Sequence, residues 1–153
     1  HQLEAQPVQV YFDNVLARWQ LMRPLLQTQI QFHDSPAMSA VFHPTIAQSI
    51  LNLLNNAADA SEKVDIEISW NADTATINIR DFGAGLDAEK MATLGQPFVT
   101  DKAEGLGLGL FLSQATLTRF GGSVILQNAA EGGTVTHITL PLLNAAVAVA
   151  KVS

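Results

Sequence analysis

The polar side chains of Asn52, Asn56 and Asp59 form one stripe along a helix predicted for the middle of the chain. Their spacings of four and three residues put them on the same face at 3.6 residues per turn. Asparagine is a mediocre helix former, so the presence of Asn55 as a third one makes the helix costly unless something offsets the penalty. A solvated polar face and a row of amides that binds a ligand or a hard cation are both open interpretations. The roughly opposite face is apolar and carries Ile46, Ile50, Leu53, Leu54 and Ala57.

A carboxylate stands at the end of a later predicted strand, with two glycines just beyond it. The segment is Asp81-Phe82-Gly83-Ala84-Gly85. Because glycine has no Cβ, backbone can come very close at Gly83 and Gly85. The sequence therefore predicts a close approach next to the Asp81 carboxylate.

The same glycines also fit a dinucleotide-binding pattern. Residues 83–88 match G-x-G-x-x-A, and Glu104 follows at about the right distance to bind a ribose. A Rossmann site needs a full helix packed on a parallel strand directly after the glycines. Gly95 and Pro97 interrupt this stretch, so we do not favour the dinucleotide interpretation.

Alternate glycines, Gly105, Gly107 and Gly109, lead into another predicted helix. They leave backbone N–H groups uncovered, and a helix N-terminus adds unpaired N–H groups and a favourable dipole, so a polyphosphate can be bound without net positive charge. Lys102 supplies one point charge, and the Walker pattern G-x-x-x-x-G-K-[ST] is absent from the sequence. Taken alone, these glycines are explained equally well by a flexible turn.

The composition indicates a folded domain without general attraction to polyanions. The chain has 153 residues, 48% of them apolar, and a net charge of -6. This predicts one core and argues against binding to nucleic acid or direct contact with an anionic membrane. The absence of cysteine excludes disulfides, thiolate metal sites and cysteine nucleophiles.

No apolar run reaches the roughly 20 residues of a membrane span. A chain that begins at His1 looks like an excised piece, so we expect a membrane segment or partner domain to lie outside it.

The order of predicted elements favours an α+β fold. Consecutive strands occur in pairs, which favours a layer of helices on one face of a mixed sheet over a doubly wound parallel sheet. We expect a single domain over residues 1–143 and a C-terminal tail over 144–153. Strands are predicted at 8–10, 26–33, 64–70, 74–80, 123–127 and 134–140; helices at 11–22, 44–60 and 108–120; and a long loop at 82–107 with a short helix near 87–93.

Five motifs follow one another along the chain: Asn52 to Ala57, Asp81-x-Gly83-x-Gly85, Phe98-x-Thr100-x-Lys102, Gly105-x-Gly107-x-Gly109-Leu110 and Gly133-Thr134. In order and spacing they resemble the N, G1, F and G2 boxes and the terminal Gly-Thr of the GHKL ATPase superfamily. More closely, they resemble the catalytic ATP-binding (HATPase) domain of sensor histidine kinases. Residues 17–24 and the G2 region are similar to RegB/PrrB-type kinases. The resemblance implies a Bergerat-type fold, a two-layer α/β sandwich.

The resemblance also implies roles for individual residues. Asn56 would bind Mg²⁺ that bridges the ATP phosphates, with Asn52 beside it. Asp81 would accept the adenine amino group, with Thr134 in support. A mobile lid over the phosphates would form from Lys102 and the glycine-rich stretch, and Asn56 and Lys102 would be the catalytic residues. The implied cofactor-binding set is Asn52, Asn56, Asp81, Gly83, Gly85, Thr100, Lys102, Gly105, Leu106, Gly107, Leu108, Gly109 and Thr134.

The function implied is transfer of the ATP γ-phosphoryl group to a histidine on a separate dimerisation and phosphoacceptor domain, in the same or a partner chain, with a response regulator downstream. We expect a cytoplasmic domain, and the resemblance allows a membrane-anchored parent protein. None of the four histidines lies in a segment that resembles the phosphoacceptor box.

Two departures from the family pattern leave alternatives open. Many members carry a basic residue three positions after the magnesium asparagine and often an aromatic one after that, where this chain has Asp59 and Ala60. A regulatory module that binds nucleotide without catalysis is therefore one alternative. The other is a GHKL hydrolase or serine kinase, whose branches resemble one another in a glutamate general base at the position that Asn52 occupies here.

Overall fold

The computed structural model describes residues 3–87 and 107–143. The helices are α1 (Val8–Met22), α2 (Pro44–Ala60) and α4 (Gly107–Arg119). The strands are β1 (Ala5–Pro7), β2 (Gln27–Phe32), β3 (Ser39–Val41), β4 (Lys63–Trp70), β5 (Thr74–Asp81), β6 (Ser123–Asn128) and β7 (Thr134–Pro141).

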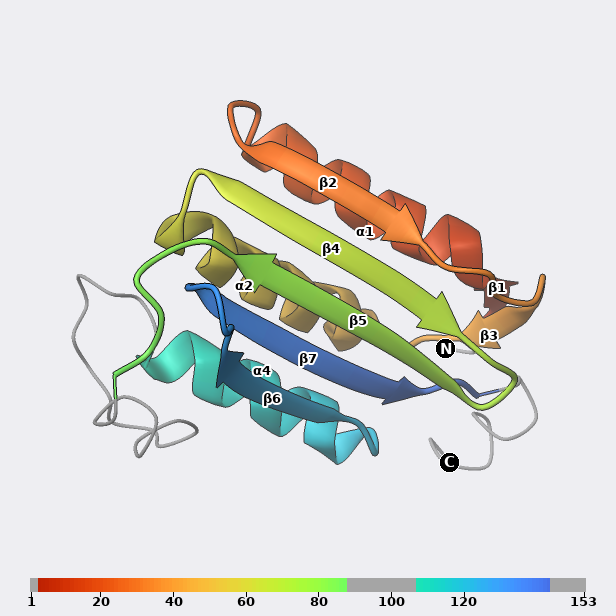
Figure 1. Ribbon diagram of the computed structural model, residues 1–153. Helices are drawn as coiled ribbons and strands as arrows, with labels where there is room; N and C mark the ends of the chain where they lie inside the picture. The colour runs from red at the N-terminus through yellow and green to blue at the C-terminus, as the bar shows by residue number, and fades with distance from the viewer. Residues whose placement is uncertain (1–2, 88–106, 144–153) are drawn as a thin grey trace.

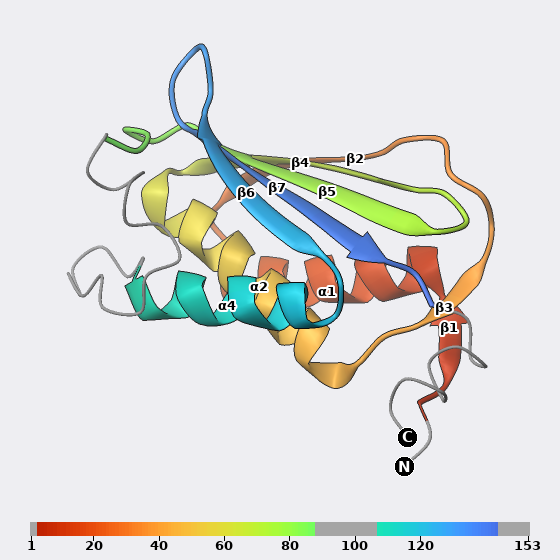
Figure 2. The same cartoon turned by 90° about the horizontal axis from the view of Figure 1, so that it is seen from below.

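Within these described ranges, five strands form one mixed sheet in the order β2-β4-β5-β7-β6. The β2 and β4 strands are parallel, whereas the other neighbouring pairs are antiparallel. Helices α1, α2 and α4 all lie on one face of this sheet (Figure 1, Figure 2). This arrangement confirms the predicted α+β fold, with one helical layer on one face of a mixed sheet.

The core lies between the helical layer and the covered face of the sheet. Alternate residues of β4, β5 and β7 point into it, as the period of two in a strand requires. The apolar face of α2 predicted from the sequence is buried against them. The largest fully buried side chains include Trp19, Phe12, Leu54, Ile66, Ile77 and Ile138.

Helix α2 has the bounds predicted from the sequence. Its first residue is Pro44, which lacks a backbone N–H and has a φ suited to the first turn. The imidazole Nδ1 of His43 caps the helix by accepting a hydrogen bond from the backbone N–H of Thr45. Local interactions therefore fix where α2 begins. The start of the helix in turn determines which face carries the polar stripe.

The strand predicted at residues 8–10 is wrong, because these residues form the first turn of α1. Val8, Tyr11, Phe12 and Val15 repeat at spacings of three and four, and all are buried on one face of the helix. The short strand instead precedes the helix as β1, which pairs antiparallel with β3. We predicted neither of these three-residue strands, since the periodicity of such short segments is not visible without the partner.

The other predicted helices and strands are confirmed with small differences in their bounds. Most of the long loop expected at 82–107 lies outside the described residues, and its last residue, Gly107, begins α4. The hairpin between β4 and β5 turns at Asn71, whose side chain accepts hydrogen bonds from the backbone N–H groups of Asp73 and Thr74. The short helix expected near residues 87–93 lies outside the described residues apart from Asp87. The expected tail at 144–153 also lies outside them. No helix in the described ranges is both long and apolar enough to span a membrane.

Candidate functional site

Asp81 is the last residue of β5 and is buried, with 6% of its surface exposed. Its Oδ1 atom accepts hydrogen bonds from the backbone N–H groups of Gly83, at 3.0 Å, and Thr134, at 3.2 Å. These two bonds use the same oxygen, so Oδ2 takes no part in them. The carboxylate is therefore held in one orientation by two separate segments of backbone.

Two glycines let three elements converge around this carboxylate. A Cβ on Gly133, which has φ +83°, would lie 2.1 Å from the carbonyl oxygen of Asp81. A Cβ on Gly83 would lie 2.5 Å from the carbonyl oxygen of Ala60, the last residue of α2. The close approach predicted next to Asp81 is present, and it joins the end of β5 to the start of β7 and the end of α2.

The segment after Asp81 is held by a residue that the sequence analysis missed. The side-chain amide of Asn128 accepts a hydrogen bond from the Leu86 N–H and donates one to the Leu86 carbonyl, both at 2.7 Å. Gly85, with φ +81°, lies against the same amide. Asn128 ends β6, 42 residues further along the chain, and nothing in its local sequence indicates this pairing.

The polar stripe of α2 runs toward the convergence point. Asn56 lies one turn before Ala60 and is half-buried. Its Nδ2 atom is buried and has no hydrogen-bond partner within the described part of the chain. Asn52, one turn earlier, accepts a hydrogen bond from Gln48 at 2.9 Å and lies 3.4 Å from the buried hydroxyl of Ser113 on α4. Of the two amides, Asn56 is thus the one whose nitrogen has no hydrogen-bond partner among the described residues.

The position at which the family resemblance implies a basic residue carries Asp59, and this carboxylate is paired. The guanidinium of Arg23 donates to Asp59 Oδ1 at 2.6 Å and to Asn55 Oδ1 at 3.1 Å. A positive charge therefore reaches this end of α2 from a different element, the turn after α1. The sequence analysis did not single out Arg23, because the contact spans more than 30 residues of chain.

Helix α4 places the end of the glycine-rich stretch beside α2. Gly107 and Leu108 begin this helix, and a Cβ on Gly109 would meet no atom of the described residues within 4 Å. The backbone at Gly109 is thus open to approach. Other predicted site residues, Thr100, Lys102, Gly105 and Leu106, lie outside the described residues.

The dinucleotide-binding alternative does not agree with the structure. The strand that precedes Gly83 is β5, which pairs antiparallel with both β4 and β7. No helix begins within residues 83–87. A Rossmann site requires both a parallel strand and a helix directly after the glycines.

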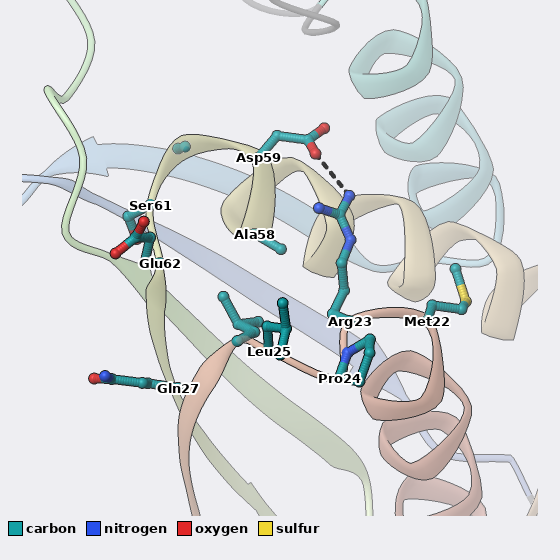
Figure 3. A pocket seen from close by; sticks show the side chains of 11 residues that line it. Met22, Arg23, Pro24, Leu25, Gln27, Ala58, Asp59, Ser61 and Glu62 are labelled. Atoms are coloured by element: carbon teal, nitrogen blue, oxygen red, sulfur yellow. Dashed lines mark hydrogen bonds and ion pairs between the residues drawn. The ribbon is translucent and has the colours of Figure 1, made fainter.

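A cavity of about 690 Å³ lies next to the site, between the turn after α1 and the end of α2 (Figure 3). Its lining comes from residues 22–27 and 58–62. It contains none of the residues predicted to bind nucleotide, so it is a separate feature of the surface.

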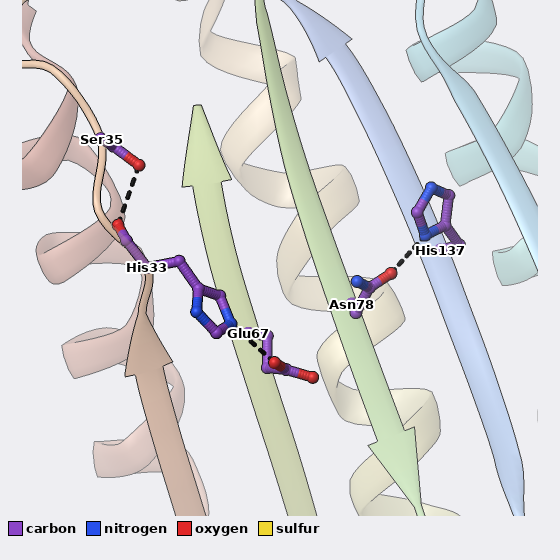
Figure 4. A network of polar contacts seen from close by, with 5 residues as sticks. All are labelled: His33, Ser35, Glu67, Asn78 and His137. Atoms are coloured by element: carbon purple, nitrogen blue, oxygen red, sulfur yellow. Dashed lines mark hydrogen bonds and ion pairs between the residues drawn. The ribbon is translucent and has the colours of Figure 1, made fainter. Parts of the chain in front are cut away.

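Three of the four histidines have structural contacts. His33 Nε2 lies 2.6 Å from Glu67 Oε1, and His137 Nδ1 is hydrogen-bonded to Asn78, both on the sheet face that the helices leave open (Figure 4). His43 caps α2. His1 lies outside the described residues.

The family comparison agrees with this geometry. The family model described as "Histidine kinase-, DNA gyrase B-, and HSP90-like ATPase" matches residues 43–144. This range contains α2, β4, β5, α4, β6 and β7. It also contains every predicted site residue, from Asn52 to Thr134. The chain belongs to this family. Membership in a family of ATPases implies that the domain uses ATP.

The curated relatives are much longer than this chain, which spans less than a quarter of the length of each one named here. Sporulation kinase E of Bacillus subtilis is 34% identical over 101 residues, which cover 63% of this chain and 14% of that protein. The C4-dicarboxylate transport sensor protein DctB of Pseudomonas aeruginosa is 34% identical over 115 residues, which cover 70% of this chain and 19% of that protein. Sensor histidine kinase RegB of Cereibacter sphaeroides is 33% identical, covering 58% and 22%. RegB is thus among the relatives, as the sequence suggested, and differently named kinases match at the same level.

Solved structures show the same fold. The catalytic domain of histidine kinase ThkA superposes with a TM-score of 0.78 at 19% identity, covering 94% of this chain and 97% of that one. The mycobacterial sensor histidine kinase MprB gives a TM-score of 0.73 at 22% identity, covering 93% and 99%.

Proposed function

We propose that the chain is the ATP-binding catalytic domain of a two-component sensor histidine kinase, acting in the cytoplasm on a phosphoacceptor domain of the same or a partner chain. A response regulator would receive the phosphoryl group afterwards. The observation that carries the proposal is the Asp81 carboxylate, oriented by Gly83 and Thr134 at the end of the helix that presents Asn56. Family membership and the kinase relatives support it.

Asp81 is suited to recognise adenine. An ionised carboxylate only accepts hydrogen bonds, so it pairs with the exocyclic amino group of adenine and opposes the carbonyl at the same position of guanine. Because Oδ1 is already engaged by two backbone N–H groups, Oδ2 is the atom offered to the base. The carboxylate needs no reorganisation when the base binds, since the protein already holds it in place.

Asn56 fits a role in holding Mg²⁺. The residue carries a hard amide oxygen for the metal, and its buried Nδ2 donor, which has no partner among the described residues, suits a phosphate oxygen. Mg²⁺ is usually bound through few protein ligands together with water and substrate phosphates. The described residues hold no cluster of three or more His, Cys, Asp or Glu side chains that could bind a metal, so the phosphates would complete the site. The metal would supply positive charge that neutralises the phosphates.

The amide of Asn52 is consistent with phosphoryl transfer and not with ATP hydrolysis. Hydrolysis needs a general base within hydrogen-bond reach of the attacking water, and a neutral amide cannot accept that proton near pH 7. In the transfer reaction a ring nitrogen of the acceptor histidine attacks the γ-phosphorus, a P–N bond forms, the bond to the β-phosphate oxygen breaks and ADP leaves. The acceptor protein provides the nucleophile, so this domain needs only to position ATP and stabilise charge.

The test compares binding, hydrolysis and transfer in one preparation. The chain should bind ATP in the presence of MgCl₂ by titration calorimetry and release phosphate far more slowly than the 1 per second or so of a competent phosphoryl-transfer enzyme. Addition of the parent protein's own phosphoacceptor domain with radiolabelled ATP should yield phosphohistidine. A matched acceptor in which that histidine is replaced by glutamine controls for label at other residues.

Each other outcome points elsewhere. Brisk hydrolysis would favour the hydrolase branch, and binding without transfer would favour a regulatory module. Absence of ATP binding would overturn the proposal.

A further inference from the structure

Arg23 joins the turn after α1 to two consecutive turns of α2. Its Nη2 lies 2.6 Å from Asp59 Oδ1, and its Nε lies 3.1 Å from Asn55 Oδ1. Figure 3 shows the guanidinium reaching from the end of α1 to the carboxylate of Asp59. The planar guanidinium has donors in fixed directions and can bond both side chains at once, which the point charge of a lysine does less well.

The backbone of Arg23 is fixed by hydrogen bonds of its own, independently of the contacts that its side chain makes. Its N–H donates to the carbonyls of Trp19 and Gln20, at 3.0 and 3.2 Å. The Trp19 side chain is fully buried, and Pro24 follows directly with a restricted φ. The guanidinium therefore extends from a fixed point, so less conformational entropy is lost when the contacts form.

The carboxylate that Arg23 contacts lies close to Asn56. Asp59 follows Asn56 by three residues on the same helix, and residues at this spacing have Cβ atoms about 5–6 Å apart. Its side chain is 54% exposed, which screens its charge in part, but at this spacing an unpaired charge would still act on a ligand held by Asn56. A free carboxylate in that place would repel a polyphosphate.

We propose that Arg23 is a positioning and charge-compensating residue of the nucleotide site, because it neutralises Asp59 and ties down the turns of α2 on either side of Asn56. The inference rests on the proposed function. It concerns how the helix is prepared for the phosphates and assigns Arg23 no direct contact with them.

The experiment is a double-mutant cycle that removes the charges of Arg23 and Asp59 singly and together. The probe is ATP in the presence of MgCl₂, and titration calorimetry measures its affinity. Arg23→Gln should weaken ATP binding by about threefold to fivefold, which is the upper part of the range for an exposed ion pair. The double variant Arg23→Gln/Asp59→Asn should return to within about twofold of the wild type, since the repelling carboxylate is gone. Asp59→Asn alone should bind at least as tightly as the wild type. High NaCl should reduce the loss in Arg23→Gln because salt screens exposed charges.

Controls separate charge from folding. Arg18→Gln removes an exposed positive charge from α1, the helix that precedes Arg23, and should leave ATP affinity unchanged. Thermal unfolding of each variant reports the lost contacts. If Arg23→Gln does not fold, Arg23→Lys takes its place, because it keeps the charge and should keep most of the affinity while losing thermal stability.

The outcomes that overturn the inference are distinct. A double variant as weak as Arg23→Gln would show that the residue acts by packing alone, and a folded Arg23→Gln with wild-type affinity would show no role at all. For the replacement, a folded Arg23→Lys that has lost affinity would contradict charge compensation. If the wild type itself fails to bind ATP, the proposed function fails and this inference falls with it.

Discussion

The backbone N–H of Thr134 donates a hydrogen bond to Asp81 Oδ1 at 3.2 Å, across 53 residues of chain. This bond joins the first residue of β7 to the last residue of β5, and neighbouring Gly133 allows the two backbones to meet. It leaves the carboxylate buried, oriented and with one oxygen not used in either backbone bond. The selectivity of the proposed nucleotide site depends on this arrangement.

The first prediction concerns the base that Asp81 selects. Asp81→Asn keeps an oxygen for the two backbone N–H groups but places an NH₂ donor where Oδ2 was. ATP affinity should fall by about tenfold or more, the effect of one lost charge-assisted bond and a donor–donor clash, and the ratio of GTP to ATP affinity should rise. Titration calorimetry with both nucleotides measures this.

Asp73→Asn is the matched control for loss of a carboxylate, since Asp73 lies in the exposed hairpin turn. Equal ATP and GTP binding by the wild type would contradict the role of Asp81. So would unchanged ATP affinity in Asp81→Ala, which should also bind at least about tenfold more weakly.

The second prediction compares two adjacent asparagines on α2. Asn56→Ala removes a buried amide nitrogen that has no partner and introduces a better helix former, so stability should be unchanged or higher. The same change should abolish the dependence of ATP binding on MgCl₂ and the transfer reaction. Asn55→Ala should lower stability, because it loses the bond from Arg23. It should leave the dependence of ATP binding on MgCl₂ in place, because it keeps Asn56.

Chemical denaturation and calorimetry with and without MgCl₂ separate these effects. A magnesium dependence that survives Asn56→Ala would show that other groups hold the metal.

The third prediction tests the close approach at Gly133. Gly132 and Gly133 both have positive φ, at 103° and 83°, so alanine at either position is strained by about 1–2 kcal/mol. Only at Gly133 would the new Cβ also collide with the Asp81 carbonyl oxygen, whereas at Gly132 no atom of residues 3–87 or 107–143 lies within 4 Å. Gly133→Ala should therefore cost about 1–3 kcal/mol more in unfolding free energy than Gly132→Ala. Urea denaturation measures both, and equal costs would mean that the strands can separate there without penalty.

The fourth prediction concerns alkaline pH. Burial raises the pKa of Tyr11 well above its usual value of 10.0, and its hydroxyl has no partner among the described residues. Because the folded state holds the proton more tightly than the unfolded state, the contribution of Tyr11 to stability should be constant below about pH 10 and fall as the pH rises beyond it. Tyr11→Phe keeps the ring stacked on Phe42 and removes the ionisable group. Its stability should fall less between about pH 10 and pH 11 than that of the wild type. Parallel loss in both proteins would contradict the assignment.

The sequence by itself determined those elements whose chemistry is local. Helix α2 begins at Pro44 and ends at Ala60 as predicted, because the His43 cap and the apolar period of 3.6 act within one segment. The alternation of exposed Gln27, Gln29 and Gln31 with half-buried neighbours follows directly from the period of two in a strand. The order and spacing of the boxes were sufficient to predict the family, which the comparison confirms.

Tertiary structure decided whatever depends on residues far apart in the chain. Val8 belongs to a helix rather than a strand because its side chain packs in the core with the rest of the α1 face, and β1 exists only because β3 pairs with it. The contacts of Asn128 with Leu86 and of Arg23 with Asp59 cross many residues, and no local pattern encodes them. A sequence pattern reports the periodicity of one segment, whereas a hydrogen bond between two segments requires the sheet and helices to bring them within about 3 Å.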